Sequence, residues 1–121
     1  MMPKILLIED IHDNAALVKK LLVSSNYDFL WAENAETGLT MAIDHCPDLI
    51  LLDLGLPDVD GQTLSVWLRN EPSLKDVPII AITAWPIETV YRMVKEYGLD
   101  GYIGKPFKTA DFLKTIRSFF S

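Results

Sequence analysis

Apolar and polar residues follow two alternating periodicities along this chain. Segments that are apolar throughout, or at every second position, are typical of β-strands, and they cover residues 4–10, 27–33, 49–53, 77–83 and 99–105. Segments with apolar residues at helical spacing cover residues 14–26, 35–45, 61–70, 86–98 and 109–120. The pattern therefore predicts five strands that alternate with five helices.

Residues that favour helix N-termini stand at the start of several helical segments. Asn14 or Asp13 is the predicted N-cap of the first helix, Asn34 that of the second and Thr109 that of the last. These positions set the expected helix boundaries.

The alternation favours a parallel sheet, because parallel strands need crossover connections and helices supply them. Segments 4–10, 49–53 and 77–83 are almost wholly apolar and belong inside the sheet, whereas 27–33 and 99–105 tolerate polar residues and suit its edges. Strand order 2-1-3-4-5 satisfies this assignment. The predicted fold class is α/β, a doubly wound five-stranded parallel sheet flanked by helices on both faces.

Size and composition indicate an ordinary globular protein. The 121 residues suit one domain covering 1–121, and half of them are apolar. The formal net charge of −6 disfavours contact with nucleic acid or an anionic membrane surface, so neither is an expected partner. Because Cys46 cannot form an internal disulfide and no secretory or membrane-spanning run is found, a cytoplasmic location is expected.

Polar residues stand where four of the predicted strands end. These residues are Glu9, Asp10, Asp53, Thr83 and Lys105. Ligands of open α/β sheets bind beyond the carboxyl ends of the strands, near the point where strand order reverses. We therefore expect these side chains to gather in one shallow depression.

Clustered carboxylates repel one another unless a cation compensates them. Mg²⁺ suits such a site, since it prefers oxygen ligands, and the backbone carbonyl of Gly55 could contribute one more oxygen. An ionised Asp53 beside a metal ion and the Lys105 ammonium could attack phosphorus and form an aspartyl phosphate. The Thr83 hydroxyl could then donate a hydrogen bond to the phosphoryl group.

Four motifs together resemble the receiver domain of two-component response regulators, whose fold is flavodoxin-like or CheY-like. They are Glu9-Asp10, DLGLPDVDG at 53–61, ITA at 82–84 and GYIGKPF at 101–107, in that order over essentially the whole chain. The resemblance implies a stand-alone receiver without an effector domain. It implies a signalling switch rather than an enzyme, one that catalyses only its own phosphoryl transfer and slow autodephosphorylation.

The resemblance also implies roles for the site residues. Asp53 would accept phosphate from a sensor histidine kinase or a histidine phosphotransfer protein. Asp10, Asp53 and the carbonyl of Gly55 would bind Mg²⁺, with Glu9 acting through a water molecule. The Lys105–Pro106 peptide bond is expected to be cis, an isomer accessible mainly to X-Pro bonds.

The family's switch pair corresponds to Thr83 and Tyr102. Through these residues, phosphorylation would reshape the face formed by the fourth helix, the fifth strand and the fifth helix. That face would contact a downstream protein effector.

Several alternatives stay open at this point. A phosphatase or phosphotransferase of the haloacid-dehalogenase type also uses a strand-end Asp with Mg²⁺, although Gly55 stands where its second Asp is expected. A receiver that binds partners without phosphorylation usually lacks the acid, Thr or Lys. Nucleotide binding ranks lower, because no Gly-rich loop follows the first strand.

Other side chains are given structural interpretations. Asp58 and Asp60 are expected to be turn and cap residues before the third helix. Trp31 and Trp67 are expected to be core or half-buried aromatics. The last helix carries Phe112, Phe119 and Phe120, and this aromatic surface either packs onto the sheet or binds a partner, which could be a second copy of the chain.

Overall fold

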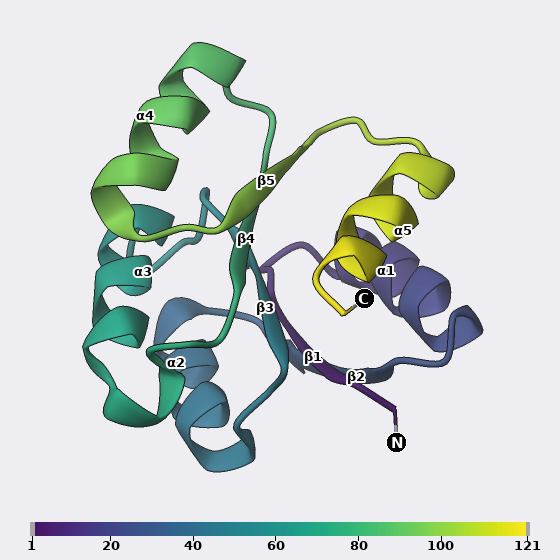
Figure 1. Ribbon diagram of the computed structural model, residues 1–121, viewed down its shortest axis with the longest axis horizontal. Coiled ribbons are helices and arrows are strands. Elements are labelled where there is room, and N and C mark those ends of the chain that lie inside the picture. The colour runs from purple at the N-terminus through teal and green to yellow at the C-terminus, as the bar shows by residue number, and fades with distance from the viewer. Residues whose placement is uncertain (1, 121) are drawn as a thin grey trace.

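The computed structural model describes residues 2–120 and contains one parallel sheet of five strands in the order β2-β1-β3-β4-β5 (Figure 1). The strands are β1 Lys4–Ile8, β2 Asp28–Ala32, β3 Leu49–Asp53, β4 Ile79–Thr83 and β5 Gly101–Gly104. All four neighbouring pairs run parallel. The predicted strand order and fold class are confirmed.

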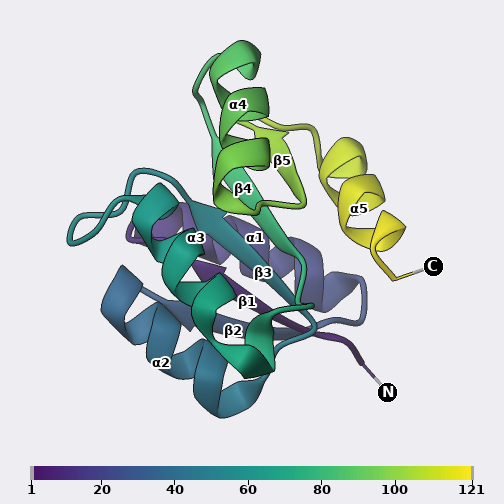
Figure 2. The same ribbon diagram turned by 60° about the vertical axis from the view of Figure 1, so that its left-hand side comes forward.

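Helices cover both faces of this sheet. They are α1 His12–Ser24, α2 Ala35–His45, α3 Gly61–Asn70, α4 Ile87–Tyr97 and α5 Thr109–Ser118, with a short 3₁₀ turn, η1, at Pro72–Leu74. Figures 1 and 2 show α1 and α5 on one face and α2, α3 and α4 on the other. No helix in the described part of the chain is long and apolar enough to cross a membrane.

Burial along the strands follows their position in the sheet. Every residue of β3 and β4 is buried, whereas β2 and β5 at the edges include half-buried and exposed residues. Central parallel strands are covered on both faces and therefore need apolar side chains throughout. The prediction of central and edge strands from their apolar content is confirmed.

Successive residues of each central strand point into different cores. Leu6 and Leu52 join the core beneath α2 and α3, while Leu7 and Leu51 join the core beneath α1 and α5. This division follows from the two-residue periodicity of a strand. Packing on both faces fixes the central strands relative to one another, and it therefore fixes the positions of their ends.

The aromatic end of α5 packs back onto the protein. Phe112 is fully buried, and Phe119 and Phe120 are half-buried against the same core. The Phe120 ring lies 5.6 Å from the Tyr27 ring, measured between centroids. Of the two interpretations of these phenylalanines, the structure supports packing.

The two tryptophans that were expected to be buried or half-buried differ in the structure. Trp31 is half-buried, as predicted, but Trp67 is 40% exposed, so the prediction for Trp67 was wrong.

Helix starts agree with the sequence at one of the three predicted caps. Asn34 caps α2, with its side chain accepting a hydrogen bond from the Thr37 N–H at 2.8 Å. The prediction for α1 was wrong, because the helix begins earlier, at His12, and Ile11 occupies the N-cap position without a side-chain bond. At α5 the N-cap position falls one residue before Thr109, and no side-chain cap forms.

Candidate functional site

The carboxyl ends of the strands bring several predicted site residues to one edge of the sheet. Asp53 ends β3 and Thr83 ends β4, and their strands pair in parallel with Asp53 opposite Ile82. Glu9 and Asp10 directly follow β1, and Lys105 directly follows β5. Parallel pairing aligns these ends, because the crossover helices return each strand to the same starting edge.

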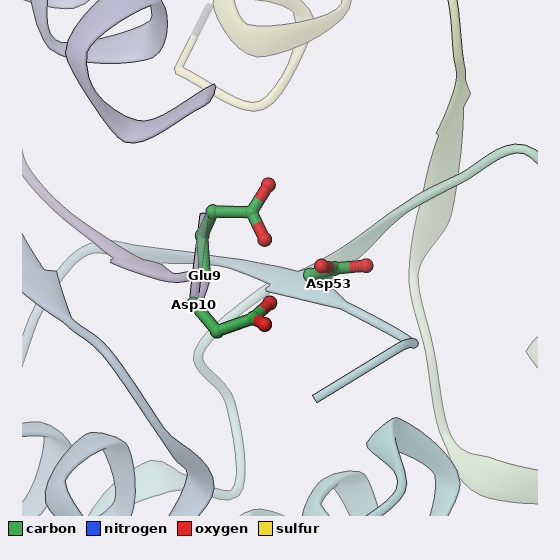
Figure 3. A group of neighbouring side chains, drawn as sticks. All are labelled: Glu9, Asp10 and Asp53. Atoms are coloured by element: carbon green, nitrogen blue, oxygen red, sulfur yellow. The ribbon is translucent and has the colours of Figure 1, made fainter. Parts of the chain in front are cut away.

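Three carboxylates form a compact cluster at this edge. One oxygen each from Glu9, Asp10 and Asp53 can be chosen so that all lie within 4.8 Å of one another. Figure 3 shows Glu9 and Asp10 extending from the end of β1 beside Asp53. Glu9 is 3% exposed and Asp53 is 8% exposed, whereas Asp10 is half-buried, so two of the three carboxylates have little contact with water.

Lys105 supplies positive charge to this cluster. Its Nζ lies 3.4 Å from Oε1 of Glu9 and 3.8 Å from Oδ1 of Asp53. A single ammonium cannot balance three carboxylates that are this close together. The site therefore favours either an additional cation or a proton.

The electrostatics of Glu9 reflect this imbalance. Burial, followed by the interaction with the Asp53 carboxylate, raises the pKa of Glu9 from 4.5 to about 7. Asn14 and Lys105 act in the opposite direction and limit the rise. A proton and a metal ion would therefore compete for this carboxyl near neutral pH.

Two oxygens of the cluster have chemistry that suits a metal ion. Among residues 2–120, Oε2 of Glu9 and Oδ1 of Asp10 are buried without a hydrogen-bond partner. Buried polar atoms are normally paired, and an unpaired carboxylate oxygen is a natural ligand for a hard cation. The oxygen-only donor set fits Mg²⁺.

The segment after β3 is tied to the Asp53 side chain. The backbone N–H of Gly55 donates a hydrogen bond to Oδ1 of Asp53 at 3.1 Å. The same Asp53 oxygen lies near Lys105. The start of this loop is thereby held beside the cluster.

The predicted switch residues occupy neighbouring strands. Thr83 is buried, and its Oγ1 accepts a hydrogen bond from the backbone N–H of Trp85 at 3.0 Å. Tyr102 is half-buried on β5, and its ring packs edge-to-face against Tyr91 of α4 with centroids 5.9 Å apart. The hydroxyl of Thr83 is thus engaged with the loop that leads to α4.

A cavity of about 370 Å³ opens beside the cluster. Its polar lining consists of Glu9, Asn14, Asp53 and Lys105, and α1 contributes the apolar side chains of Leu17 and Val18. The sequence interpretation treated Asn14 as a possible cap and missed its place at the site. Its spacing of one helical turn from Asp10 was the available signal.

The peptide bond between Lys105 and Pro106 is cis, as the family resemblance implied.

Asp58 and Asp60 both bind helix N-termini, but different ones. Asp60 caps α3 by accepting from the Thr63 N–H at 2.8 Å, as expected. Asp58 instead reaches α2, where its two carboxylate oxygens accept from the Ala35 N–H at 2.9 Å and the Glu36 N–H at 3.1 Å. These bonds, chiefly the one from the Ala35 N–H, lower the pKa of Asp58 below its ordinary value of 3.8.

Comparison with known proteins agrees with this geometry. The family described as "Response regulator receiver domain" matches residues 5–117. The polar-differentiation response regulator DivK of Brucella anthropi is 34% identical over 119 residues, which cover 98% of this chain and 97% of the relative.

Solved structures share the fold. The chemotaxis response regulator CheY4 of Vibrio cholerae superposes with a TM-score of 0.93 at 24% identity, covering 98% of this chain and 99% of that one. The receiver domain of the sensor histidine kinase PA1611 from Pseudomonas aeruginosa PAO1 has a TM-score of 0.90 at 29% identity, with 100% of both chains covered. That structure is described with a magnesium ion coordinated in its active-site cleft.

Proposed function

The chain belongs to the response regulator receiver domain family, and we propose that it is a phosphorylation switch whose phosphoacceptor is Asp53. The phosphodonor is a sensor histidine kinase or a histidine phosphotransfer protein in the cytoplasm. The observation that carries this proposal is the position of Asp53, a buried carboxylate at a strand end with Lys105 Nζ 3.8 Å from its Oδ1.

Phosphoryl transfer to Asp53 needs a nucleophile and charge neutralisation. A carboxylate oxygen of Asp53 attacks phosphorus, and the P–N bond to the donor histidine breaks. The electron pair of that bond returns to the imidazole nitrogen, which takes up a proton. Lys105 lies close enough to Asp53 to neutralise charge on the phosphoryl oxygens, which lowers the barrier to transfer.

The acidic cluster is proposed to hold Mg²⁺. The carboxylates of Asp10 and Asp53 and the carbonyl of Gly55 would bind the ion, and Glu9 would act through a water molecule. When bound, Mg²⁺ would supply positive charge against the phosphoryl oxygens. The similar PA1611 receiver domain, described with Mg²⁺ in its cleft, supports this assignment.

Output is proposed to pass through Thr83 and Tyr102. The Thr83 hydroxyl would turn toward the phosphoryl group, and the ring of Tyr102 would change its packing beside α4. The face formed by α4, β5 and α5 would then bind a downstream protein effector or, alternatively, a second copy of the chain. The exposed side chains of Ile87 and Tyr91 on α4 give this face apolar surface for such a contact.

Phosphorylation with a small-molecule donor tests the proposal directly. The protein is mixed with Mg²⁺ and acetyl phosphate, and its intact mass is measured over time. The expected result is one added phosphoryl group on the parent chain and on the control Asp76→Asn, but none on Asp53→Asn. Label on Asp53→Asn, or none on the parent chain, would overturn the assignment. Rapid multiple turnover of a generic phosphate ester would instead favour the phosphatase alternative.

A further inference from the structure

The last two residues of β2 and the residue that follows them, Glu33, contact the turn that carries Asp10. The indole N–H of Trp31 donates a hydrogen bond to the carbonyl oxygen of Glu9 at 2.8 Å. The carbonyl of Ala32 accepts from the N–H of Glu9 at 3.0 Å. Oε1 of Glu33 lies 2.6 Å from Nε2 of His12. We refer to residues 9–12 as the Asp10 turn.

In the part of the chain that the structure describes, the acids of this turn have one ion-pair partner, Lys105, whose Nζ lies 3.4 Å from Oε1 of Glu9. Within the described residues, Oε2 of Glu9 and Oδ1 of Asp10 have no hydrogen-bond partner. Both carboxylates also face Asp53 across the cluster, and like charges at this separation repel. The hydrogen bonds from β2 to the backbone of Glu9 therefore help to hold the turn in place against this repulsion.

Trp31 is suited to that task. It is half-buried and packs against the core beneath α1 and α5, so its ring has a fixed support. Its ring also meets the His12 ring edge-to-face, with centroids 4.9 Å apart. Trp31 thus contacts one residue on each side of Asp10, at Glu9 and at His12.

We propose that Trp31 is a positioning residue for cation binding, which acts by fixing the Asp10 turn through the carbonyl of Glu9. Groups that orient metal ligands from outside the coordination sphere typically change metal affinity by 10–100-fold when they are removed. Phenylalanine at position 31 would retain an aromatic ring against the core but lose the N–H donor. The inference rests on the proposed function to the extent that Mg²⁺ binds the acidic cluster.

The test compares two substitutions on the same face of β2. Mg²⁺ is titrated into the parent chain, Trp31→Phe and the matched control Phe29→Leu, and amide chemical shifts report the dissociation constant. Phe29 is also half-buried against the core beneath α1 and α5, so its substitution perturbs packing without removing a contact to the Asp10 turn. We expect Trp31→Phe to weaken Mg²⁺ binding by about tenfold and Phe29→Leu by less than twofold.

A second measurement uses the unaltered protein without metal. The Trp31 indole proton should exchange with solvent at least about a hundredfold more slowly than that of the exposed Trp67, because a local opening must precede exchange. Equal exchange rates, or equal weakening of Mg²⁺ binding by both substitutions, would overturn the inference. If the parent chain failed to bind Mg²⁺, the proposed function itself would fall, so the two failures are distinguishable.

Discussion

The ammonium of Lys105 lies 3.4 Å from the carboxylate of Glu9, although the two residues are 96 positions apart in the chain. The sheet creates this pair, because β1 and β5 both end at the edge where Asp53 lies. Lys105 is 26% exposed while the Glu9 side chain is almost wholly buried, so the pair joins the water-accessible mouth of the site to its interior. Lys105 therefore lies where its ammonium can contact both the buried carboxylate of Glu9 and an incoming phosphoryl oxygen.

Replacing Lys105 by methionine is expected to slow phosphorylation of Asp53 by about a hundredfold or more. The substitution keeps an unbranched side chain but removes the ammonium near Oδ1 of Asp53, and the loss of one charge-stabilising donor typically costs that much in rate. The rate of mass increase with acetyl phosphate measures the effect. Lys108→Met, at an exposed position on the same loop, is the control and should react at the parental rate. Equal rates for the parent chain and Lys105→Met would contradict the role of Lys105.

The raised pKa of Glu9 predicts a pH dependence of stability in the metal-free protein. Its pKa of about 7 in the folded state exceeds the ordinary value of 4.5, so between these values the folded state binds more protons than the unfolded state. The contribution of protonated Glu9 to the free energy of unfolding is therefore fully present below pH 4.5, and it is lost as the pH rises toward 7. The slope from this group is at most about 1.4 kcal/mol per pH unit.

Urea unfolding in the presence of a chelator, between pH 5 and pH 8, measures this effect. The free energy of unfolding of the parent chain is compared with that of Glu9→Gln at each pH. The glutamine keeps the shape of the side chain but does not titrate in this range. We expect the free energy of unfolding of the parent chain to fall relative to Glu9→Gln as the pH rises to about 7 and then to level off. Parallel profiles would show that Glu9 has an ordinary pKa.

The sequence predicted which side chains gather at this edge of the sheet, because most of them interrupt an apolar strand at its end. Glu9, Asp53 and Thr83 stand out for this reason, and parallel pairing is enough to bring strand ends together. The positions of the central and edge strands could also be predicted, because a strand buried on both faces consists almost entirely of apolar residues and an edge strand does not.

Contacts between distant loops left no such mark on the sequence. Arg69 joins the end of α3 to the loop before β5, donating to the carbonyl of Gly98 at 2.9 Å and pairing with Asp100. The bond from Trp31 to the carbonyl of Glu9 likewise depends on how an edge strand lies beside a turn. A long polar side chain on a helix or strand looks the same in the sequence whether it meets water or a distant carbonyl.

Asp58 is expected to stabilise the fold through the N-terminus of α2. Asp58→Ala removes two backbone hydrogen bonds at Ala35 and Glu36 and should lower the free energy of unfolding by about 1 kcal/mol at neutral pH. Urea unfolding measures the change, and Asp76→Ala, at an exposed loop acid, serves as the control.

The pH dependence of this effect has a defined direction. Because the pKa of Asp58 is lowered on folding, its contribution is present above the ordinary pKa of 3.8 and is lost as the pH falls through the lower folded value. The difference between Asp58→Ala and the parent chain should therefore shrink in strong acid. A difference that persists unchanged there would assign the effect to packing instead of the charged cap.

The bond between Thr83 and Trp85 predicts an optical signal of activation. Oγ1 of Thr83 accepts from the Trp85 N–H at 3.0 Å, and Trp85 is 41% exposed. If the Thr83 side chain turns so that Oγ1 moves toward a phosphoryl group, its bond to the Trp85 N–H is altered, and the segment that carries the indole is expected to shift. Beryllofluoride with Mg²⁺, which mimics the phosphorylated carboxylate, should therefore change the tryptophan fluorescence of the parent chain.

Thr83→Ser retains a hydroxyl and should preserve most of the change, whereas Thr83→Ala, without the acceptor, should lose most of it. Trp85→Phe identifies the reporting indole, because a signal that survived this substitution would have to come from Trp31 or Trp67. An equal response in Thr83→Ala and the parent chain would separate the loop movement from the hydroxyl and contradict its part in the switch.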